Sequence, residues 1–240
     1  GCMSIVGAKV IRKEDPNLLT GRGQYVDDIQ LTGITHMAFV RSTEAHALIK
    51  GIDVSAALEC EGVIGAWTAA DLELPPLPEV PGLERPTLAT DKVRFVGEAV
   101  AVIVAENKYA AADGTELVVV DYDPLEAVTN IEEATKDDAP LLFEELGSNT
   151  VAEVPSADDH QAVFDSAPHT ETIKLINNRC TAAPIETSAC LADYGPAGLT
   201  IWASFQAPHH LRNRISAWLG IPQDQCRVIT PDVGGGFGQK

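Results

Sequence analysis

The residues best suited to chemistry lie near the C-terminal end, where residues 233–240 read Val-Gly-Gly-Gly-Phe-Gly-Gln-Lys. Four of the five residues from Gly234 to Gly238 are glycine. Glycines bury no side chain and lose much entropy on folding, but their bare backbone lets N–H groups converge on a closely approaching ligand. The preceding segment 226–230 alternates like a strand, and the end of a strand is a common place for an anionic cofactor. We therefore expect a cofactor site here, completed by further polypeptide.

The glycine loop does not match the common nucleotide-binding motifs. No Gly-Lys-Ser/Thr follows it, which excludes a Walker-type phosphate loop, and the third glycine has the wrong spacing for a dinucleotide fingerprint. A tight structural turn is the alternative interpretation. Phe237, an aromatic ring among glycines, favours a shaped cavity wall instead.

Gln206 is the second candidate, 31 positions before Phe237. It lies between a predicted strand, 199–205, and a predicted helix that begins at Pro208 and ends before Gly220. A side-chain amide at such a junction can form a hydrogen bond with a ligand. The helix has apolar residues at helical spacing that form one face: Leu211, Ile215, Trp218 and Leu219.

Other reactive side chains carry weaker signals. His209 and His210 are adjacent on the helix and point in different directions, so we do not expect them to bind a metal together. Glu186 and Asp193 could form a carboxylate pair, but no wider set of residues in the sequence supports a site around them. Cys190 is expected to be a small buried hydrophobe. The cysteines are scattered without a Cys-x-x-Cys pair, which argues against zinc or iron–sulfur ligation within this chain.

Composition restricts the possible partners. The chain of 240 residues carries a net charge of -18 and has a pI of about 4.5. This charge argues against binding to nucleic acid or to an anionic membrane surface. The longest apolar runs, such as 99–105, are far shorter than the ~20 residues of a membrane span. No secretory signal is visible, so reduced thiols and a cytoplasmic location are expected.

The N-terminal part has the pattern of a small α+β domain. A polar, extended segment is expected over 11–31 and a proline-rich surface loop over 74–86. Asn107 is expected to cap a helix over 108–116, in which Gly114 costs about 1 kcal/mol relative to alanine. A short helix is expected over 54–58, and strands are expected over 34–41, 62–68, 92–95, 99–104 and 117–121.

The second part begins after an acidic stretch. We interpret 141–164 as a linker, because it contains Glu144, Glu145 and Glu153 and has little apolar periodicity. Beyond it, 169–176 and 187–194 alternate like strands. A turn at 195–198 predicts that 199–205 pairs back with 187–194 as a hairpin.

The ordered set of motifs resembles the N-terminal portion of the molybdenum-containing large subunit of the xanthine dehydrogenase, aldehyde oxidase and carbon monoxide dehydrogenase family. The resemblance runs from about residue 10 to 240. Within it, the sequences of residues 206–209 and 231–238 are most similar to carbon monoxide dehydrogenase-like bacterial members of the family. The segments that carry it are Arg12-Lys13-Glu14-Asp15, Leu19 to Ile29, Val40-Arg41-Ser42, Ala45-His46-Ala47, Val96 to Ala101, Pro184-Ile185-Glu186-Thr187, Phe205 to His209 and Gly234 to Gly238.

This resemblance implies an α+β fold and a set of cofactor contacts. Residues 1–140 would form the α/β hammerhead domain with its N-terminal extended segment, and 165–240 an incomplete start of the molybdopterin-binding domain. The glutamine at position 206 would donate a hydrogen bond to an oxo ligand of molybdenum. Phe237, with Gly235, Gly236 and Gly238, would contact the metal and the pyranopterin largely through the backbone. No residue of this chain is expected to bind the metal directly.

The resemblance also implies a reaction and partners. The reaction would be oxidation or hydroxylation of a small molecule, such as an aldehyde, an N-heterocycle or carbon monoxide, with water as the oxygen source. Bacterial relatives suggest the cytosine dinucleotide form of molybdopterin. FAD and [2Fe-2S] clusters would lie on partner subunits, typically in a dimer of heterotrimers.

The chain lacks parts that the family's large subunits have. These subunits are several hundred residues longer, and the substrate-positioning residues and the glutamate that serves as general base lie in the missing portion. No catalytic residue is therefore assigned in this chain, which is expected to be inactive without the remainder of the subunit. Two alternatives are a non-catalytic binding or assembly module that retains only the hammerhead domain, and a nucleotide-binding protein.

Overall fold

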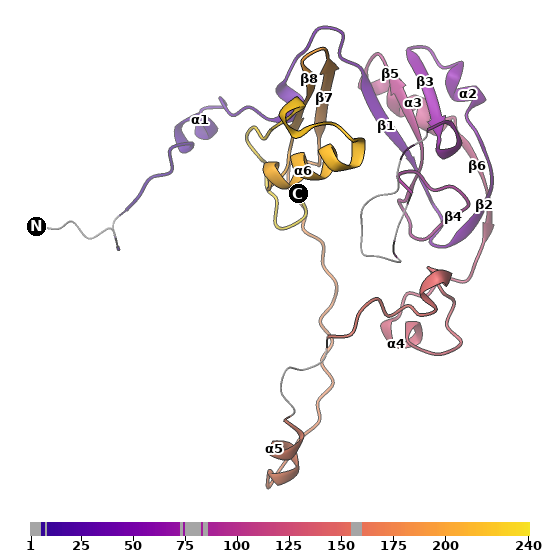
Figure 1. Cartoon of the computed structure of the whole chain (residues 1–240), viewed down its shortest axis with the longest axis vertical. Coiled ribbons are helices and arrows are strands. Elements are labelled where there is room, and N and C mark those ends of the chain that lie inside the picture. The colour runs from indigo at the N-terminus through magenta and orange to yellow at the C-terminus, as the bar shows by residue number, and fades with distance from the viewer. Residues whose placement is uncertain (1–5, 8, 73, 75–82, 84–85, 155–159) are drawn as a thin grey trace, which may run out of the picture. The chain divides into compact units, whose positions relative to one another are not determined.

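The computed structural model divides the chain into two compact units, one formed by Gly33–Ile176 and the other by Gly1–Thr32 with Asn177–Lys240 (Figure 1). It describes residues 6–7, 9–72, 74, 83, 86–154 and 160–240. Most of the predicted proline-rich loop, and residues 155–159 of the predicted linker, lie outside these described residues. None of the described helices is long and apolar enough to cross a membrane.

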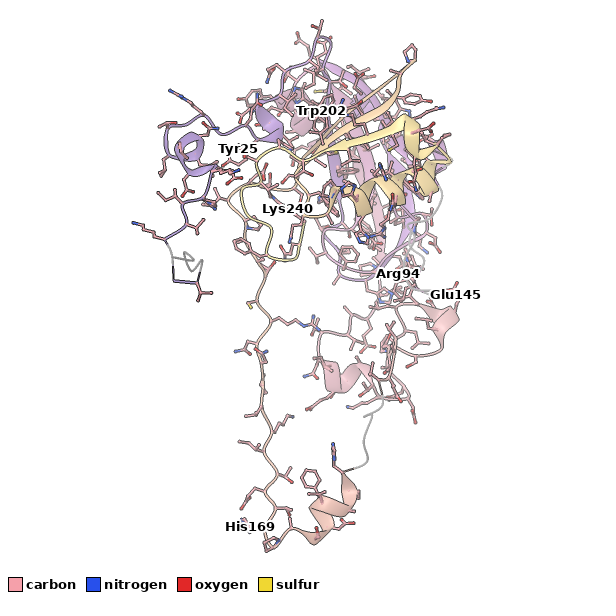
Figure 2. The ribbon with its side chains drawn as sticks, turned by 60° about the vertical axis from the view of Figure 1, so that its left-hand side comes forward. Tyr25, Arg94, Glu145, His169, Trp202 and Lys240 are labelled. Atoms are coloured by element: carbon pink, nitrogen blue, oxygen red, sulfur yellow. The ribbon has the colours of Figure 1, made fainter. Side chains whose placement is uncertain are left out.

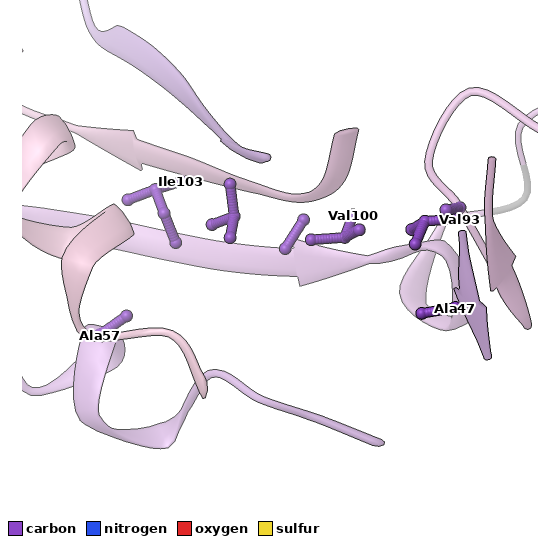
Figure 3. Close-up of a cluster of buried hydrophobic side chains, with 8 residues drawn as sticks. Ala47, Ala57, Val93, Val100 and Ile103 are labelled. Carbon is purple, nitrogen blue, oxygen red and sulfur yellow. The ribbon is translucent and has the colours of Figure 1, made fainter. Parts of the chain in front are cut away.

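A three-stranded antiparallel sheet built around β5 (Ala99–Ala105) forms the centre of the larger unit. β1 (His36–Arg41) pairs with one edge of β5 and β3 (Val63–Thr68) with the other. β5 is an uninterrupted apolar run, as expected for a strand covered on both faces. Val100 and Ile103 are fully buried and form a core with Ala47, Ala57 and Val93 (Figure 3).

A second antiparallel sheet in this unit has the order β4 (Lys92–Val93), β2 (Ala47–Asp53), β6 (Val119–Pro124). The strand β2 was missing from the predicted elements. Lys50 and Gly51 interrupt its apolar alternation, and the register with β6 shifts between Ile49 and Gly51. Pairing on both edges, which a local pattern does not reveal, makes this segment a strand.

The predicted helix over 108–116 is confirmed as α3 (Lys108–Glu116). The Asn107 side chain accepts hydrogen bonds from the N–H groups of Tyr109 and Ala110, as an N-cap does. The remaining helices of this unit are short: α2 (Ser55–Leu58), η2 (Ala69–Asp71), α4 (Ile131–Ala134), η3 (Glu144–Leu146) and α5 (Gln161–Ser166).

The smaller unit is a βαβ arrangement preceded by a hairpin strand. The predicted hairpin is confirmed as β7 (Cys190–Gly195) and β8 (Gly198–Ala203). β8 continues into α6 (Pro208–Leu219), and β9 (Cys226–Ile229) then pairs with β8 in parallel. Leu211 and Ile215 of α6 pack against the sheet, whereas Leu219, at the end of the predicted apolar stripe, is exposed. A 3-10 turn, η4 (Gln223–Gln225), precedes β9.

Two sequence expectations are wrong. The N-terminal segment 11–31 is not wholly extended, because it contains α1 (Asp15–Leu19) and the 3-10 turn η1 (Val26–Asp28). The strand expected over 169–176 is absent: these residues have an exposed, irregular backbone. An alternating pattern forms a strand only beside a pairing partner, and no described strand pairs with this segment.

Replacing Gly114 by alanine should destabilise the protein despite alanine's higher helix propensity. A Cβ at this position would lie 2.9 Å from Ile103 Cγ2 and 3.0 Å from Val63 Cγ2. Overpacking of a core costs about 1–3 kcal/mol, more than the propensity gain of about 1 kcal/mol. We expect urea unfolding to show a net loss of about 1 kcal/mol in the free energy of unfolding. Ala112→Gly, at an exposed position of the same helix, is the control for the change in helix propensity alone. A Gly114→Ala protein more stable than the wild type would contradict the packing argument.

Candidate functional site

The parallel pairing of β8 with β9 brings Gln206 and the glycine loop together. Parallel neighbours end at the same edge of a sheet, the edge where α/β proteins place their ligands. Gln206 follows β8, and the loop Gly234–Lys240 follows β9. Trp202 of β8 and Lys240 at the end of the loop can be followed in Figure 2.

Gln206 is hydrogen-bonded directly to the loop. Its side-chain oxygen Oε1 accepts from the N–H of Gly238 at 2.9 Å and from the N–H of Lys240 at 3.3 Å. Two backbone donors on one side-chain atom require that atom to be the oxygen, which assigns the orientation of the amide. The Nε2 amide group has no hydrogen-bond acceptor among the described residues, and Gln206 is exposed.

The middle of the loop presents backbone donors. No described residue accepts a hydrogen bond from the N–H of Gly235, Gly236 or Phe237. Phe237 is the only described residue other than glycine with a positive φ, 52°, a conformation uncommon for a bulky side chain. Phe237 is 74% exposed. The loop therefore combines a positive φ at Phe237, an exposed aromatic residue and three consecutive N–H groups without a described acceptor, next to the Gln206 amide.

Glu186 anchors this arrangement, although no role was predicted for it from the sequence. Its Oε2 accepts hydrogen bonds from Ser204 Oγ at 2.7 Å, from the Gly234 N–H at 2.8 Å and from Lys240 Nζ at 2.8 Å. The Glu186 N–H also donates to the Gly234 carbonyl oxygen at 3.2 Å. One carboxylate thus holds the end of β8 and both ends of the loop.

In the charge pair of Glu186 and Lys240, the lysine is buried and the glutamate is half-buried. Their side chains are 14% and 2% exposed. Burial by itself would raise the pKa of Glu186, but the hydrogen bonds from Lys240, Ser204 and Gly234 outweigh it, so the pKa is lowered. Glu186 is therefore a carboxylate at neutral pH. Its other oxygen, Oε1, is buried without a hydrogen-bond partner in the described part of the chain.

Three of the loop glycines lie close against side chains of this same chain, and a Cβ on Gly235 would lie 2.9 Å from Phe237 Cε2. A Cβ on Gly234 would lie 2.4 Å from Glu186 Cβ, and one on Gly236 would lie 2.6 Å from Gln206 Cδ. Gly235 and Gly238 have φ values of 101° and 86°, which favour glycine. The glycine pattern thus reflects contacts with Glu186 and Gln206 as well as bare backbone for a ligand.

The other sequence candidates do not join this site. His209 and His210 are exposed in the first turn of α6, and Asp193 is exposed on β7. Cys190 is exposed, so the expectation that it is buried is wrong. Within the described ranges, no group of three His, Cys, Asp or Glu side chains could hold a metal ion.

Comparison with protein families identifies two domains in the chain. Residues 20–126 match the family model "Aldehyde oxidase and xanthine dehydrogenase, a/b hammerhead domain", and residues 142–240 match "Molybdopterin cofactor-binding domain". Together the two models cover most of the chain.

Curated relatives match almost the whole chain. It is 40% identical over 248 residues to the nicotine 6-hydroxylase large subunit of Paenarthrobacter nicotinovorans, covering 99% of this chain and 30% of that protein. It is 38% identical to the carbon monoxide dehydrogenase large chain of Afipia carboxidovorans, covering 98% and 31%. The chain thus spans just under a third of the length of these relatives.

Solved structures share the fold. The quinoline 2-oxidoreductase of Pseudomonas putida 86 matches with a TM-score of 0.88 and 38% identity, over 98% of this chain and 31% of that chain. The reconstituted carbon monoxide dehydrogenase of Oligotropha carboxidovorans matches with a TM-score of 0.89 and 38% identity, over 98% and 32%.

Replacing Gly236 by alanine should disturb the contact between Gln206 and the loop. The new Cβ would overlap the end of the Gln206 side chain, which is exposed and would move away, losing its hydrogen bonds to Gly238 and Lys240 at about 0.5–1.5 kcal/mol each. Urea unfolding should show a loss in that range. Gly195→Ala is the control, because a Cβ there meets no atom within 4 Å. Equal stability of the two variants would contradict the close approach of Gln206 to Gly236.

The contribution of Glu186 to stability should depend on pH. Its folded pKa lies below the ordinary value of 4.5, so its stabilisation is present above that value and lost as the pH falls through the folded pKa. Glu186→Gln leaves Lys240 buried without a countercharge and should cost about 3 kcal/mol at neutral pH. The difference between wild type and variant should shrink in acid, as measured by urea unfolding. A difference that stays constant with pH, or one equal to that of the exposed control Asp193→Asn, would contradict this role.

Proposed function

Because the chain belongs to the molybdenum hydroxylase large-subunit family, we propose that it forms part of the molybdenum-cofactor subunit of an oxidoreductase. This enzyme would oxidise or hydroxylate a small carbon substrate, such as an aldehyde, an N-heterocycle or carbon monoxide, with water as the oxygen source. We assign residues 1–140 to the hammerhead domain and its N-terminal extension, 141–164 to an acidic linker, and 165–240 to the start of the cofactor-binding domain. The alternative of a non-catalytic module is not favoured, because the cofactor-binding model matches 142–240.

The observation that carries the proposal is the orientation of the Gln206 amide. Gly238 and Lys240 occupy its oxygen, which leaves the Nε2 amide group as a donor. Oxo ligands and the pyranopterin are rich in hydrogen-bond acceptors, so a site for this cofactor needs donors. Gln206 Nε2 and the N–H groups of Gly235, Gly236 and Phe237 form such a donor set. The residues present therefore fit the molybdenum cofactor.

Each of these residues has a distinct role in the proposed site. Gln206 donates to an oxo ligand of the metal, and Gly235, Gly236, Phe237 and Gly238 line the cofactor through their backbone. The Phe237 ring, exposed in this chain, would form an apolar wall beside the bound cofactor. When bound, the molybdenum cofactor supplies the redox chemistry, and the protein orients it. Preformed donors of this kind need little reorganisation when charge develops in a reaction.

The remainder of the enzyme is proposed from the relatives. These include a large subunit, a large chain, and subunit gamma of the 6-hydroxypseudooxynicotine dehydrogenase complex. We infer a cytoplasmic assembly, a dimer of heterotrimers, in which partner subunits carry FAD and [2Fe-2S] clusters. The cofactor is inferred to be the cytosine dinucleotide form of molybdopterin. The general base is placed outside residues 1–240, so this portion alone would not be competent.

Gln206→Ala in the complete enzyme should reduce turnover without unfolding the protein. Loss of one preorganised donor typically lowers kcat by about 100-fold or more. Steady-state kinetics with the enzyme's substrate, together with the melting temperature, would measure both effects. Gln225→Ala, at an exposed position of η4, is the matched control. Unchanged turnover in Gln206→Ala would remove the role proposed for this residue.

A further inference from the structure

We propose that Glu186 is a positioning residue for the cofactor site: by holding both ends of the glycine loop, it sets the direction of the Gln206 amide and of the loop N–H groups. The identity of the ligand rests on the proposed function. We call the hydrogen bonds of Glu186 with Ser204, Gly234 and Lys240 the Glu186 clamp. The clamp is a property of this chain and can be tested without the cofactor.

The clamp closes a ring of contacts through Lys240. The ammonium group of Lys240 donates to Glu186, while its backbone N–H donates to Gln206 Oε1. Gly234, at the start of the loop, donates to the same oxygen of Glu186. Gly234 and Lys240 are thereby tied to one atom of Glu186. Gln206 Oε1 accepts from Gly238, which lies between them, and from Lys240.

Glu186 is also linked to Gln206 by a second route, through Ser204 of the same backbone segment. Ser204, whose hydroxyl donates to Glu186, lies two residues before Gln206 and is buried. The backbone that carries Gln206 and the loop that orients its oxygen are therefore held by one carboxylate. Among the described hydrogen bonds, those of the Glu186 side chain go to Ser204, Gly234 and Lys240 and to none of the proposed ligand-facing groups. Glu186 would therefore affect a ligand only indirectly, by positioning Gln206 and the loop N–H groups.

The charge on Glu186 makes this clamp strong. A hydrogen bond to a charged group shifts a local equilibrium by roughly 10- to 100-fold, more than a neutral one does. A glutamine at this position keeps the size and one acceptor but removes the countercharge of Lys240, and a buried unpaired charge is costly. Loss of the carboxylate should therefore release the loop ends first, because their bonds share that single oxygen.

The direct test is hydrogen exchange of the loop amides in metal-free protein. Glu186→Gln should speed exchange at Gly234, Gly238 and Lys240 by about 10- to 100-fold, while amides in β5 stay unchanged. If Glu186→Gln alone fails to fold, the double variant Glu186→Gln/Lys240→Met removes both charges and should show the same loop release. Lys240→Arg, which retains the ion pair with Glu186, and Asp193→Asn should both keep protection at the wild-type level. Wild-type protection in the double variant would overturn the proposal.

A second measurement separates the clamp from the proposed function. Molybdenum per subunit in the complete enzyme, determined by elemental analysis after dialysis, should fall in Glu186→Gln and stay at the wild-type level in Lys240→Arg. Faster loop exchange with unchanged molybdenum content in both Glu186→Gln and Gln206→Ala would support the clamp and contradict the proposed cofactor site. Unchanged exchange in Glu186→Gln with reduced molybdenum content in Gln206→Ala would overturn the clamp and leave the proposed function standing.

Discussion

The hydrogen bonds to a single oxygen of Glu186 hold the candidate site together. A buried carboxylate is tolerated only when its partners replace the water it has lost. Here the replacements are an ammonium group, a hydroxyl and a backbone N–H from three separate segments. Burial would favour the neutral acid, yet the pKa is lowered because these donors together outweigh desolvation. The requirement to satisfy one charge thus fixes the relative positions of β8, the start of the loop and its end.

The βαβ unit makes this convergence possible. Parallel pairing of β8 with β9 requires a crossover, and α6 provides it by packing Leu211 and Ile215 against the sheet. The segments after both strands then emerge at one edge. Glu186 precedes β7 and reaches the same edge through its backbone contact with Gly234. The sheet topology places the segments near each other, and the carboxylate fixes them at hydrogen-bonding distance.

Elements with local signals could be predicted from the sequence, and those that depend on distant partners could not. The Asn107 cap, α3, the hairpin and α6 are specified by caps, turns and periodicity within a few residues, and all were found. The strand β2 was missed because Lys50 and Gly51 hide a pattern that pairing with β4 and β6 stabilises. The strand expected over 169–176 failed for the opposite reason, since it has a suitable pattern but no described partner.

The same distinction applies to the site. The loop composition and the strand-to-helix junction identified Phe237 and Gln206 as candidates, because both signals are local. Glu186 had no such signal: its partners lie 18, 48 and 54 residues away in the sequence. Lysine is almost never fully buried unless it is paired, so the burial of Lys240 could not be anticipated. The amide orientation of Gln206 likewise follows only from the folded loop.

The glycine run illustrates why composition alone understates the role of a loop. Glycine-rich runs are commonly explained by the need for a ligand to approach the backbone. In this loop Gly234 and Gly236 make room for Glu186 and Gln206, whereas Gly235 and Gly238 permit positive φ angles. The chain therefore uses all four glycines for its own conformation. The conformation of the loop is therefore set by contacts within this chain and does not require a ligand. The N–H groups of residues 235–237 take no part in these internal hydrogen bonds and remain as donors.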